Sequence, residues 1–257
     1  MREPRIQLGD VYKAFGDKKV LDGLDLEVFD GEALVVIGGS GTGKSVLLKH
    51  IIGLLHPDAG TVRVDGVDIA TLDFREITEF RRRFGMAFQE GALFDSMTVW
   101  ENVAFPLQRA RRFNSGQIRD RVAECLDMVE LEGNESKYPG ELSGGMRRRV
   151  GFARAIALQP QILLFDEPTT GLDPVIKVTI DDIIVHLKER LRCTSVTITH
   201  DMASALRIAD RIAMLADGRI LAAAPPAEFR RLDVPQVQAF LRGAGFADGP
   251  SADRRER

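Results

Sequence analysis

The feature that most constrains this chain is a glycine-rich stretch, GGSGTGKS at 38–45, between an apolar run and an apolar-patterned segment. The run ALVVI at 33–37 predicts a strand buried on both faces, and the segment from Ser45 to about Leu55 predicts a helix. Glycines in this setting let the backbone fold closely round a phosphate, with amide N–H groups facing the anion. A flexible glycine turn is the alternative, which the strand, the helix and the Gly-Lys-Ser ending disfavour. The sequence therefore predicts a phosphate-binding loop.

Two segments supply the groups that chemistry on a phosphate needs. In the loop, Lys44 is expected to reach the outer phosphates and the Ser45 hydroxyl to coordinate Mg²⁺. A second apolar run, ILLF at 162–165, ends in Asp166 and Glu167, at the edge where α/β ligand sites form. Asp166 suits Mg²⁺, and Glu167 is the candidate base that orients or deprotonates an attacking water. Because adjacent strand residues point to opposite faces, we expect the two carboxylates to have different roles.

Three further polar residues stand at expected strand ends. Gln89 ends the strand candidate MAFQ, His200 follows SVTIT, and Asp173 lies in TGLDP. A histidine after a strand is more often structural, but this strand end faces the expected nucleotide, so we predict that His200 contacts the γ-phosphate. Gln89 is a candidate to contact Mg²⁺ or the water. The remaining histidines are interpreted as structural: His50, His56 and His186.

The order of the apolar patterns predicts the fold class. Strands alternate with helices on both sides of a helical stretch at about 95–158, which implies an α/β fold with a parallel sheet and right-handed crossovers. The N-terminal part carries short alternating segments broken by Gly-Asp and Asp-Gly turn signals. We expect one domain at 1–242 with a loosely ordered tail at 243–257. Within it we expect a core at about 1–90 and 159–232, an inserted helical subdomain at about 91–158, and a short helix in VPQVQAFLRG at 234–243.

Charge and cysteine content exclude several classes of protein. The formal net charge of -3 gives no general electrostatic reason to bind nucleic acid. Cys125 and Cys193 lie in apolar-patterned elements, which suits buried thiols better than a disulfide framework. The sequence shows no secretory signal and no apolar run near the roughly 18 residues that cross a bilayer. Any membrane part is therefore expected to come from another chain.

The stretch ELSGGMRRRVGFARA at 141–155 predicts a helix with an unusual beginning. Ser143 is a good N-cap, but two glycines and three arginines fill the first turns, where a helix N-terminus disfavours positive charge. The pattern indicates that an anion reaches this helix end from elsewhere. The alternative for Arg147 and Arg148 is a solvated charged face.

Taken in order, GGSGTGKS, Gln89, LSGGM, ILLFDEP, TGLDP and SVTITHD resemble the nucleotide-binding subunit of ATP-binding cassette (ABC) transporters, over about residues 5–240. The resemblance implies a P-loop NTPase fold: a RecA-like parallel-sheet core, an antiparallel β N-terminal part and an inserted α-helical subdomain. It also implies ATP hydrolysis with Mg²⁺ by a head-to-tail homodimer. Each ATP would lie on the loop of one subunit and under the LSGG of the other.

This resemblance implies a role for each candidate residue. A helix N-terminus at 143–145 would meet the γ-phosphate of the partner's ATP. Phe15 would stack on adenine, with Tyr12 as the nearby alternative. The implied catalytic residues are Glu167, His200 and Gln89, and the implied metal ligands are Ser45, Gln89 and Asp166. The implied nucleotide-binding residues are Phe15, Gly38, Gly39, Ser40, Gly41, Thr42, Gly43, Lys44, Ser45, Val46, Ser143, Gly144, Gly145 and Asp173.

The segment FQEGALFDSMTVWENVAFPL at 88–107 is similar to the ATPases of Mla-type (maintenance of lipid asymmetry, toluene-tolerance or Mkl-like) phospholipid transporters. This likeness implies a place on the cytoplasmic face of the bacterial inner membrane. The implied partners are integral membrane permease subunits, a periplasmic lipid-binding MCE-type subunit and, in some bacteria, a small STAS-type regulatory subunit. Ala92, Leu93 and Phe94 are expected to offer an apolar patch to a permease helix, with packing inside the lobe as the alternative for Leu93.

Two other functions share most of these motifs. An ABC importer or exporter of another solute differs only in the segment at 88–107. A soluble ABC ATPase, such as the iron-sulfur assembly type, has a similar length and transports nothing. Repair and chromosome ATPases would bring long coiled coils, zinc cysteines or a basic surface, and this sequence has none of these.

Overall fold

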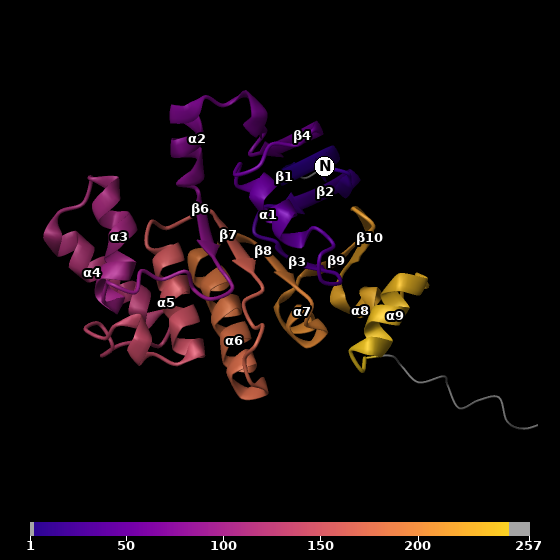
Figure 1. The fold of residues 1–257 in the computed structure, drawn as a ribbon. Coiled ribbons are helices and arrows are strands. Elements are labelled where there is room, and N and C mark those ends of the chain that lie inside the picture. The colour runs from indigo at the N-terminus through magenta and orange to yellow at the C-terminus, as the bar shows by residue number, and fades with distance from the viewer. Residues whose placement is uncertain (1–2, 247–257) are drawn as a thin grey trace, which may run out of the picture.

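Two β-sheets enclose helix α1 (Lys44–Ile51) in this structure, a computed structural model that describes residues 3–246 (Figure 1). The strands are β1 (Pro4–Phe15), β2 (Lys18–Phe29), β3 (Ala33–Ile37), β4 (Ala59–Val64), β5 (Val67–Asp68), β6 (Phe84–Ala87), β7 (Ile162–Asp166), β8 (Thr194–Thr199), β9 (Arg211–Ala216) and β10 (Arg219–Ala224). The other helices are α2 (Phe74–Arg81), α3 (Val99–Ala110), α4 (Ser115–Asp127), α5 (Gly144–Ile156), α6 (Pro174–Leu191), α7 (Met202–Ile208), α8 (Pro226–Phe229) and α9 (Pro235–Gly243), with single 3-10 turns at Ile69–Thr71 and Pro139–Glu141.

The larger sheet confirms the predicted parallel core. Its strand order is β10-β9-β3-β8-β7-β6, and β3 pairs in parallel with both β8 and β9. All five residues of β3 are buried, with Leu34 and Val36 on the face toward α1 and Val35 and Ile37 on the face toward α6 and α7. Both faces are therefore covered, which is why this strand reads as an unbroken apolar run rather than an alternating one.

The smaller sheet is antiparallel, as expected, but its strands are longer than the sequence pattern indicates. It has the order β2-β1-β4-β5, and β1 and β2 are each 12 residues long. The Gly-Asp pair at 9–10, read as a turn signal, lies instead inside β1, where Asp10 has a φ of 50° and the pairing register shifts between Leu8 and Val11. A β-bulge inserts an unpaired residue without ending the strand, so the local signal resembles that of a turn.

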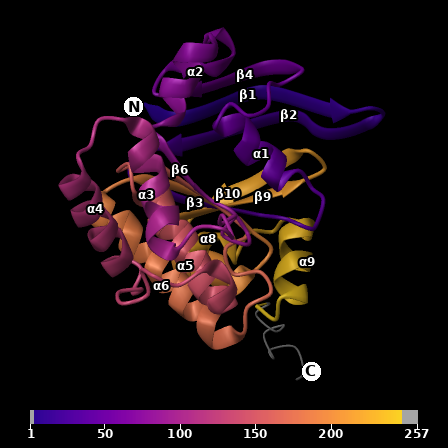
Figure 2. The ribbon, with the colours of Figure 1, turned by 60° about the vertical axis from the view of Figure 1, so that its left-hand side comes forward.

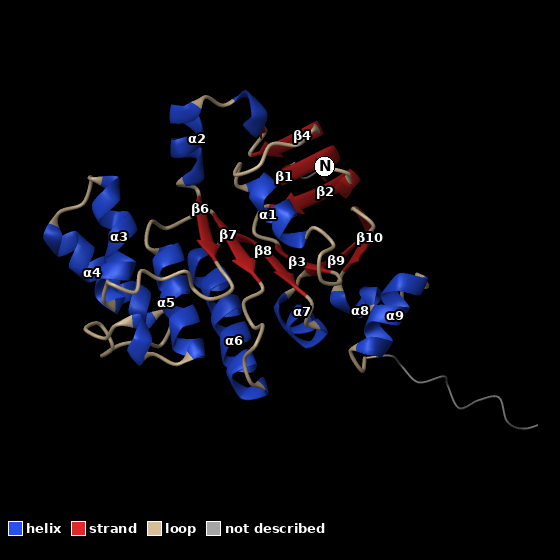
Figure 3. Cartoon of the chain, viewed as in Figure 1, coloured by secondary structure: helices blue, strands red, loops and turns tan. Residues whose placement is uncertain are grey.

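The helical lobe, formed by α3, α4 and α5, lies beside β6 at one edge of the larger sheet (Figure 3). Capping boxes begin two of its helices, at Thr98 with Glu101 and at Asn114 with Gln117. The apolar side chains of the lobe belong to the same buried cluster as the face of the larger sheet that packs against α6. In this cluster Phe152 of α5 packs edge-on against Phe165 of β7, with 5.2 Å between the two ring centroids. The lobe is thus fixed to the core by packing. The domain boundaries predicted from the sequence remain a prediction.

Several local predictions can be compared with the structure. The helix after the loop ends at Ile51 rather than near Leu55, and the strand placed at 86–89 occupies 84–87. The short helix near 234–243 is present as α9, whose buried Val237 and Leu241 join the larger apolar cluster on the far side of the molecule from the lobe (Figure 2). Both cysteines are buried free thiols. Of the tail predicted at 243–257, residues 247–257 lie outside the described residues.

None of the helices within residues 3–246 combines the length and the apolar character needed to span a membrane.

Candidate functional site

Four loops that carry candidate residues leave the same edge of the larger sheet. In the parallel register, Ile37 of β3 pairs with Thr199 of β8, and Ile198 of β8 pairs with Asp166 of β7. The glycine-rich loop, His200 and Glu167 therefore begin at the carboxyl ends of three adjacent strands. Gln89 follows β6, which is the next strand. Ligand sites of open α/β sheets form at this edge.

The glycine-rich loop folds back on itself and presents backbone amides. Gly43 precedes α1 with a φ of 103°, and a Cβ at this position would lie 2.9 Å from a methyl group of Val20, so only glycine fits. Among residues 3–246, no side chain caps the N-terminus of α1, which leaves the first-turn N–H groups to a ligand. The Lys44 ammonium lies inside the loop, donating to the carbonyls of Gly38 at 2.9 Å and Gly39 at 3.0 Å.

Ser45 and Asp166 meet across the site. The Ser45 hydroxyl donates to Asp166 Oδ1 at 3.2 Å, joining two residues that are 121 positions apart. Burial raises the pKa of Asp166, and this effect outweighs the hydrogen bond from Ser45, which lowers it. A half-buried carboxylate beside a hydroxyl is a set of hard oxygen donors, and Mg²⁺ prefers such ligands. The two side chains therefore fit the metal that the sequence predicts.

Glu167 has other contacts than Asp166, but strand alternation does not separate the two residues, and their different roles remain a prediction. It lies just beyond β7 in the left-handed region, with a φ of 49°, so a turn rather than strand alternation separates the two carboxylates. Its Oε2 accepts a hydrogen bond from Thr170 Oγ1 at 2.8 Å and lies 2.8 Å from Nδ1 of His200. Its Oε1 lies 3.4 Å from Nζ of Lys44. The carboxylate is thus held on both oxygens and aimed toward the loop.

Phe15 lies beside the loop, at the tip of the β1–β2 hairpin. Its side chain is 49% exposed and lines one pocket together with residues of the loop, including Gly41, Lys44 and Ser45, and with Glu167. Tyr12, the alternative aromatic, does not line this pocket, and a hydrogen bond to Asp10 raises the pKa of its hydroxyl. Val46 also lines the pocket. Of the two aromatic residues, Phe15 is the one with an exposed ring next to the loop.

The LSGG helix end lies at a second pocket. Ser143 caps α5, accepting a hydrogen bond from the amide of Met146 at 3.2 Å, and Gly144 lines a pocket that also contains Gln89. Within the described part of the chain, residues 143–145 do not line the pocket at the loop. One copy of the chain therefore presents the loop and the helix tip in separate pockets.

The three arginines after LSGG do not lack partners. Arg147 donates to the Leu142 carbonyl at 2.6 Å, and Arg149 donates to the Glu130 carbonyl at 2.8 Å. Arg148 is buried and donates to the carbonyls of Gln89 and Thr170. Backbone carbonyls carry the partial negative charge that these guanidinium groups need. The arginines therefore give no evidence of their own for an anion, and the approach of an anion to this helix end remains a prediction. The alternative of a solvated face is wrong for Arg148.

Two further candidates have clear structural positions. Asp173 caps α6, its carboxylate accepting from the amides of Val175 and Ile176 at 3.1 Å. Gln89 lines the pocket at the α5 N-terminus and not the one at the loop. The contact of Gln89 with a metal ion or water remains a prediction. Sequence reasoning missed Thr170, because a threonine in TTGLDP carries no signal that its hydroxyl binds Glu167.

Comparisons with known proteins agree with this geometry. The family described as "ABC transporter" matches residues 21–170. The chain is 41% identical over 238 residues to "Probable ribonucleotide transport ATP-binding protein mkl" of Mycobacterium leprae, covering 93% of this chain and 69% of that protein. It is 40% identical over 250 residues to "Intermembrane phospholipid transport system ATP-binding protein MlaF" of Haemophilus influenzae, covering 97% and 94%. It is also 42% identical over 254 residues to "Sulfate/thiosulfate import ATP-binding protein CysA" of Xylella fastidiosa, covering 95% and 72%.

A solved structure extends the likeness to three dimensions. The dimeric post-hydrolysis state of the ATP-binding cassette MJ0796, bound to ADP and Pi, superposes with a TM-score of 0.78 at 35% identity, over 86% of this chain and 98% of that one. The fold class and the resemblance to Mkl and MlaF proteins are thereby confirmed. With its phosphate loop, its paired carboxylates and these relatives, the chain belongs to the ABC transporter family, as an ATP-binding subunit with the ATPase fold.

Proposed function

We propose that this chain hydrolyses ATP to drive phospholipid transport by an ABC system at the cytoplasmic face of a bacterial inner membrane. The single observation that carries the catalytic part is the placement of Glu167, held by Thr170 and His200 beside the Lys44 ammonium. Among the relatives, MlaF is described as part of a phospholipid transport system, and it corresponds to this chain over nearly its whole length. That correspondence supports phospholipid as the cargo.

The loop would bind the triphosphate of ATP. Its amides and the uncapped N-terminus of α1 would face the phosphates, with the Lys44 ammonium on the outer ones. The exposed ring of Phe15 would stack on adenine, a contact that tolerates any base. Ser45 and Asp166 would hold Mg²⁺, and His200 would contact the γ-phosphate. When bound, Mg²⁺ would neutralise charge on the phosphate oxygens.

Glu167 would orient the attacking water and accept its proton. The hydrogen bond from Thr170 and the contact with His200 fix the direction of its carboxylate, so little reorganisation is needed. Glu167 contacts Thr170, His200 and Lys44, whereas Asp166 accepts a hydrogen bond from Ser45. The chain thereby separates metal binding from proton transfer.

A homodimer would complete each site. The helix tip at 143–145 would approach the γ-phosphate bound on the partner's loop, and Asp173 would lie between the two sites. The separate pockets of one copy support this arrangement, as does the dimeric state of the solved cassette bound to ADP and Pi.

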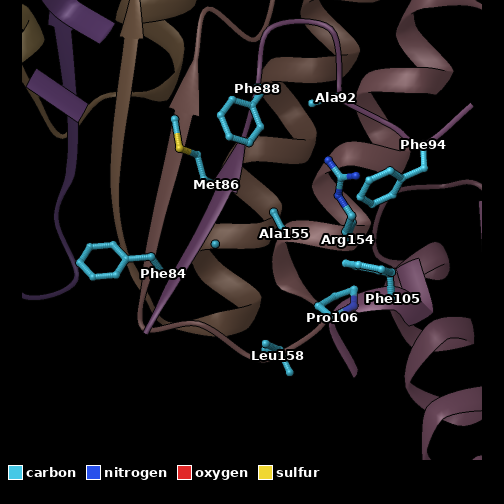
Figure 4. Close-up of a pocket in the computed structure, with 11 residues that line it drawn as sticks. Phe84, Met86, Phe88, Ala92, Phe94, Phe105, Pro106, Arg154, Ala155 and Leu158 are labelled. Carbon is cyan, nitrogen blue, oxygen red and sulfur yellow. The ribbon is translucent and has the colours of Figure 1, made fainter. Parts of the chain in front are cut away.

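An apolar pocket beside Gln89 would receive a helix of the permease. It has a volume of about 370 Å³ and lies between β6, α5 and α3 (Figure 4). We name it the docking pocket; its lining includes Phe84, Met86, Phe88, Phe94, Phe105 and Leu158. Leu93 is half-buried against the lobe, so Phe94, which is 42% exposed, is the more accessible of the two residues. The pocket fits an apolar anchor of an amphipathic helix.

Other partners and cargoes are part of the same proposal. A periplasmic MCE-type lipid-binding subunit and a STAS-type regulatory subunit would belong to the system, as they do in the transporters that this chain resembles. The CysA relative, described as a sulfate and thiosulfate importer, makes transport of another solute the second candidate.

Purification from native membranes tests the proposal. The chain would be isolated in mild detergent with its bound partners, followed by mass spectrometry of protein and lipid. We expect a multi-span permease with copurified phospholipid. A permease without lipid but with a periplasmic solute-binding protein would support the second candidate, and a soluble partner alone would contradict transport.

A further inference from the structure

Arg148 joins two segments of the site that are far apart in the sequence. It lies on α5, is only 7% exposed, and donates from Nε to the Gln89 carbonyl at 2.6 Å and from Nη2 to the Thr170 carbonyl. Its third nitrogen, Nη1, is buried without a hydrogen-bond partner within the described residues. Burial lowers the pKa of the guanidinium, but an arginine stays protonated at neutral pH. A buried cation on two backbone carbonyls is a strong and directional connection.

At one end, Arg148 holds the segment that forms a wall of the docking pocket. Gly91 of that segment lies directly on α5: a Cβ at Gly151 would be 2.9 Å from the Gly91 Cα. Arg154 donates to the Gly91 carbonyl at 2.7 Å, and its guanidinium lies 5.7 Å from the ring of Phe94 (Figure 4). The segment at 88–94 and helix α5 are therefore packed so closely that one cannot shift without the other.

At the other end, Arg148 holds the loop that positions Glu167. Thr170, whose carbonyl accepts from Arg148, donates from its own hydroxyl to Glu167 Oε2 at 2.8 Å. A continuous series of hydrogen bonds thus runs from Gln89 through Arg148 and Thr170 to Glu167. Each of its links is a contact of the folded chain, so a displacement at Gln89 reaches the carboxylate through two side chains.

We propose that Arg148 is a positioning residue that ties the docking-pocket segment at 88–94 to the Glu167 loop at 167–173, so that occupation of the pocket alters the placement of Glu167. The inference deepens the proposed function and rests on it for the identity of the occupant, a permease helix. The planar guanidinium suits this role because its donors are fixed relative to one another and reach both carbonyls together. A lysine in its place offers one point charge and cannot hold the two in a set geometry.

Arg149 provides a matched control on the same helix. Arg149 is half-buried, whereas Arg148 is buried, and it likewise donates to two backbone carbonyls, those of Val129 and Glu130 in the helical lobe. Replacing it removes a similar set of charge-assisted hydrogen bonds without touching either end of the connection. A loss of amide protection or of activity that follows from general weakening of α5 would therefore appear in both variants.

Hydrogen exchange of the full chain tests the connection without requiring activity. In Arg148→Gln we expect amide exchange to become about tenfold faster at both 88–94 and 167–173, the loss expected for one charge-assisted hydrogen bond. Arg149→Gln should change neither segment. Faster exchange at only one of the two segments, at neither, or equally in both variants would overturn the proposal. Arg148→Lys, which keeps the charge, should give the same pattern and replaces Arg148→Gln if that variant does not fold.

Steady-state kinetics provide the second readout. Because the hydrogen bonds of Arg148 go to Gln89 and Thr170 rather than to the phosphate loop, Arg148→Gln should lower kcat for ATP about tenfold while KM stays within about twofold. Thr170→Val should lower kcat similarly but leave exchange at 88–94 unchanged, since it removes only the last link. A rise in KM with constant kcat would contradict positioning of Glu167. These outcomes do not depend on the partner or cargo, so they remain distinct from a failure of the membrane purification.

Discussion

Asp181 provides a quantitative test of the packing behind the site. It is a buried residue of α6, 3% exposed, and its carboxylate accepts a hydrogen bond from Ser204 of α7. Ser204 in turn lies 3.3 Å from the Thr169 hydroxyl, in the loop that holds Glu167. Its Oδ1 has no hydrogen-bond partner within residues 3–246. A buried carboxylate with one unsatisfied oxygen favours the protonated form.

The magnitude follows from the pKa. Burial raises the pKa of Asp181 from 3.8 to about 6, against the opposing effect of the Ser204 hydrogen bond; Asp201 and Asp182 raise it further and Arg207 lowers it. At about 1.4 kcal/mol for each pH unit, this interval corresponds to about 3 kcal/mol. The folded state binds the proton of Asp181 more tightly than the unfolded state does. The stabilisation of the fold by this proton is therefore fully present below pH 3.8 and is lost as the pH rises through about 6.

Asp181→Asn removes the titrating group while keeping its size and its acceptor for Ser204. The free energy of unfolding, measured by urea titration from pH 4 to 8, should be similar to that of the unmodified chain near pH 4. Above pH 6.5 the free energy of unfolding of Asp181→Asn should exceed that of the unmodified chain by up to about 3 kcal/mol. Asp182→Asn, at an exposed position that pairs with Arg207, is the control and should show no such rise. A difference that stays constant across this pH range, or a variant that is less stable at pH 7.5, would refute the reasoning.

Three further predictions concern the site and its packing. Glu167→Gln should still bind ATP but stall hydrolysis, so that an ATP-bound dimer accumulates on size-exclusion chromatography; normal turnover would remove Glu167 as the base. Lys44→Ala should abolish tight ATP binding, measured by calorimetry, and mixing it with Ser143→Arg chains should restore activity in heterodimers with one intact site, whereas no restoration would argue against sites shared between copies. Gly151→Ala should destabilise the fold by about 1–3 kcal/mol, because the new methyl meets the Gly91 backbone at 2.9 Å; an unchanged Tm would show that the two segments separate easily.

The sequence allowed accurate prediction where local pattern and chemistry agree. The strand at 33–37, the loop after it and the helix that follows lie where the motif places them, and the carboxylates at 166 and 167 end a buried strand as expected. The helical lobe and the helix at 235–243 also follow their apolar periodicity. These features depend on short-range spacing, which a single sequence displays directly.

Predictions that needed long-range contacts were less accurate. The arginines at 147–149 look like unpaired charge in the sequence, yet their partners include the backbone carbonyls of Leu142, Gln89, Thr170 and Glu130. The bulge at Asp10 looks like a turn, because the residue preferences of the two overlap.

The sequence by itself determined which chemical groups this protein has for phosphate chemistry and the order in which strands deliver them to one edge of a sheet. Only the tertiary structure decided which of those groups touch: Ser45 with Asp166, Glu167 with Thr170 and His200, and Arg148 with two distant carbonyls. The physical reason is that a backbone carbonyl exists at every residue and leaves no mark in the sequence. Which carbonyl a buried guanidinium meets is set by the packing of helices on the sheet.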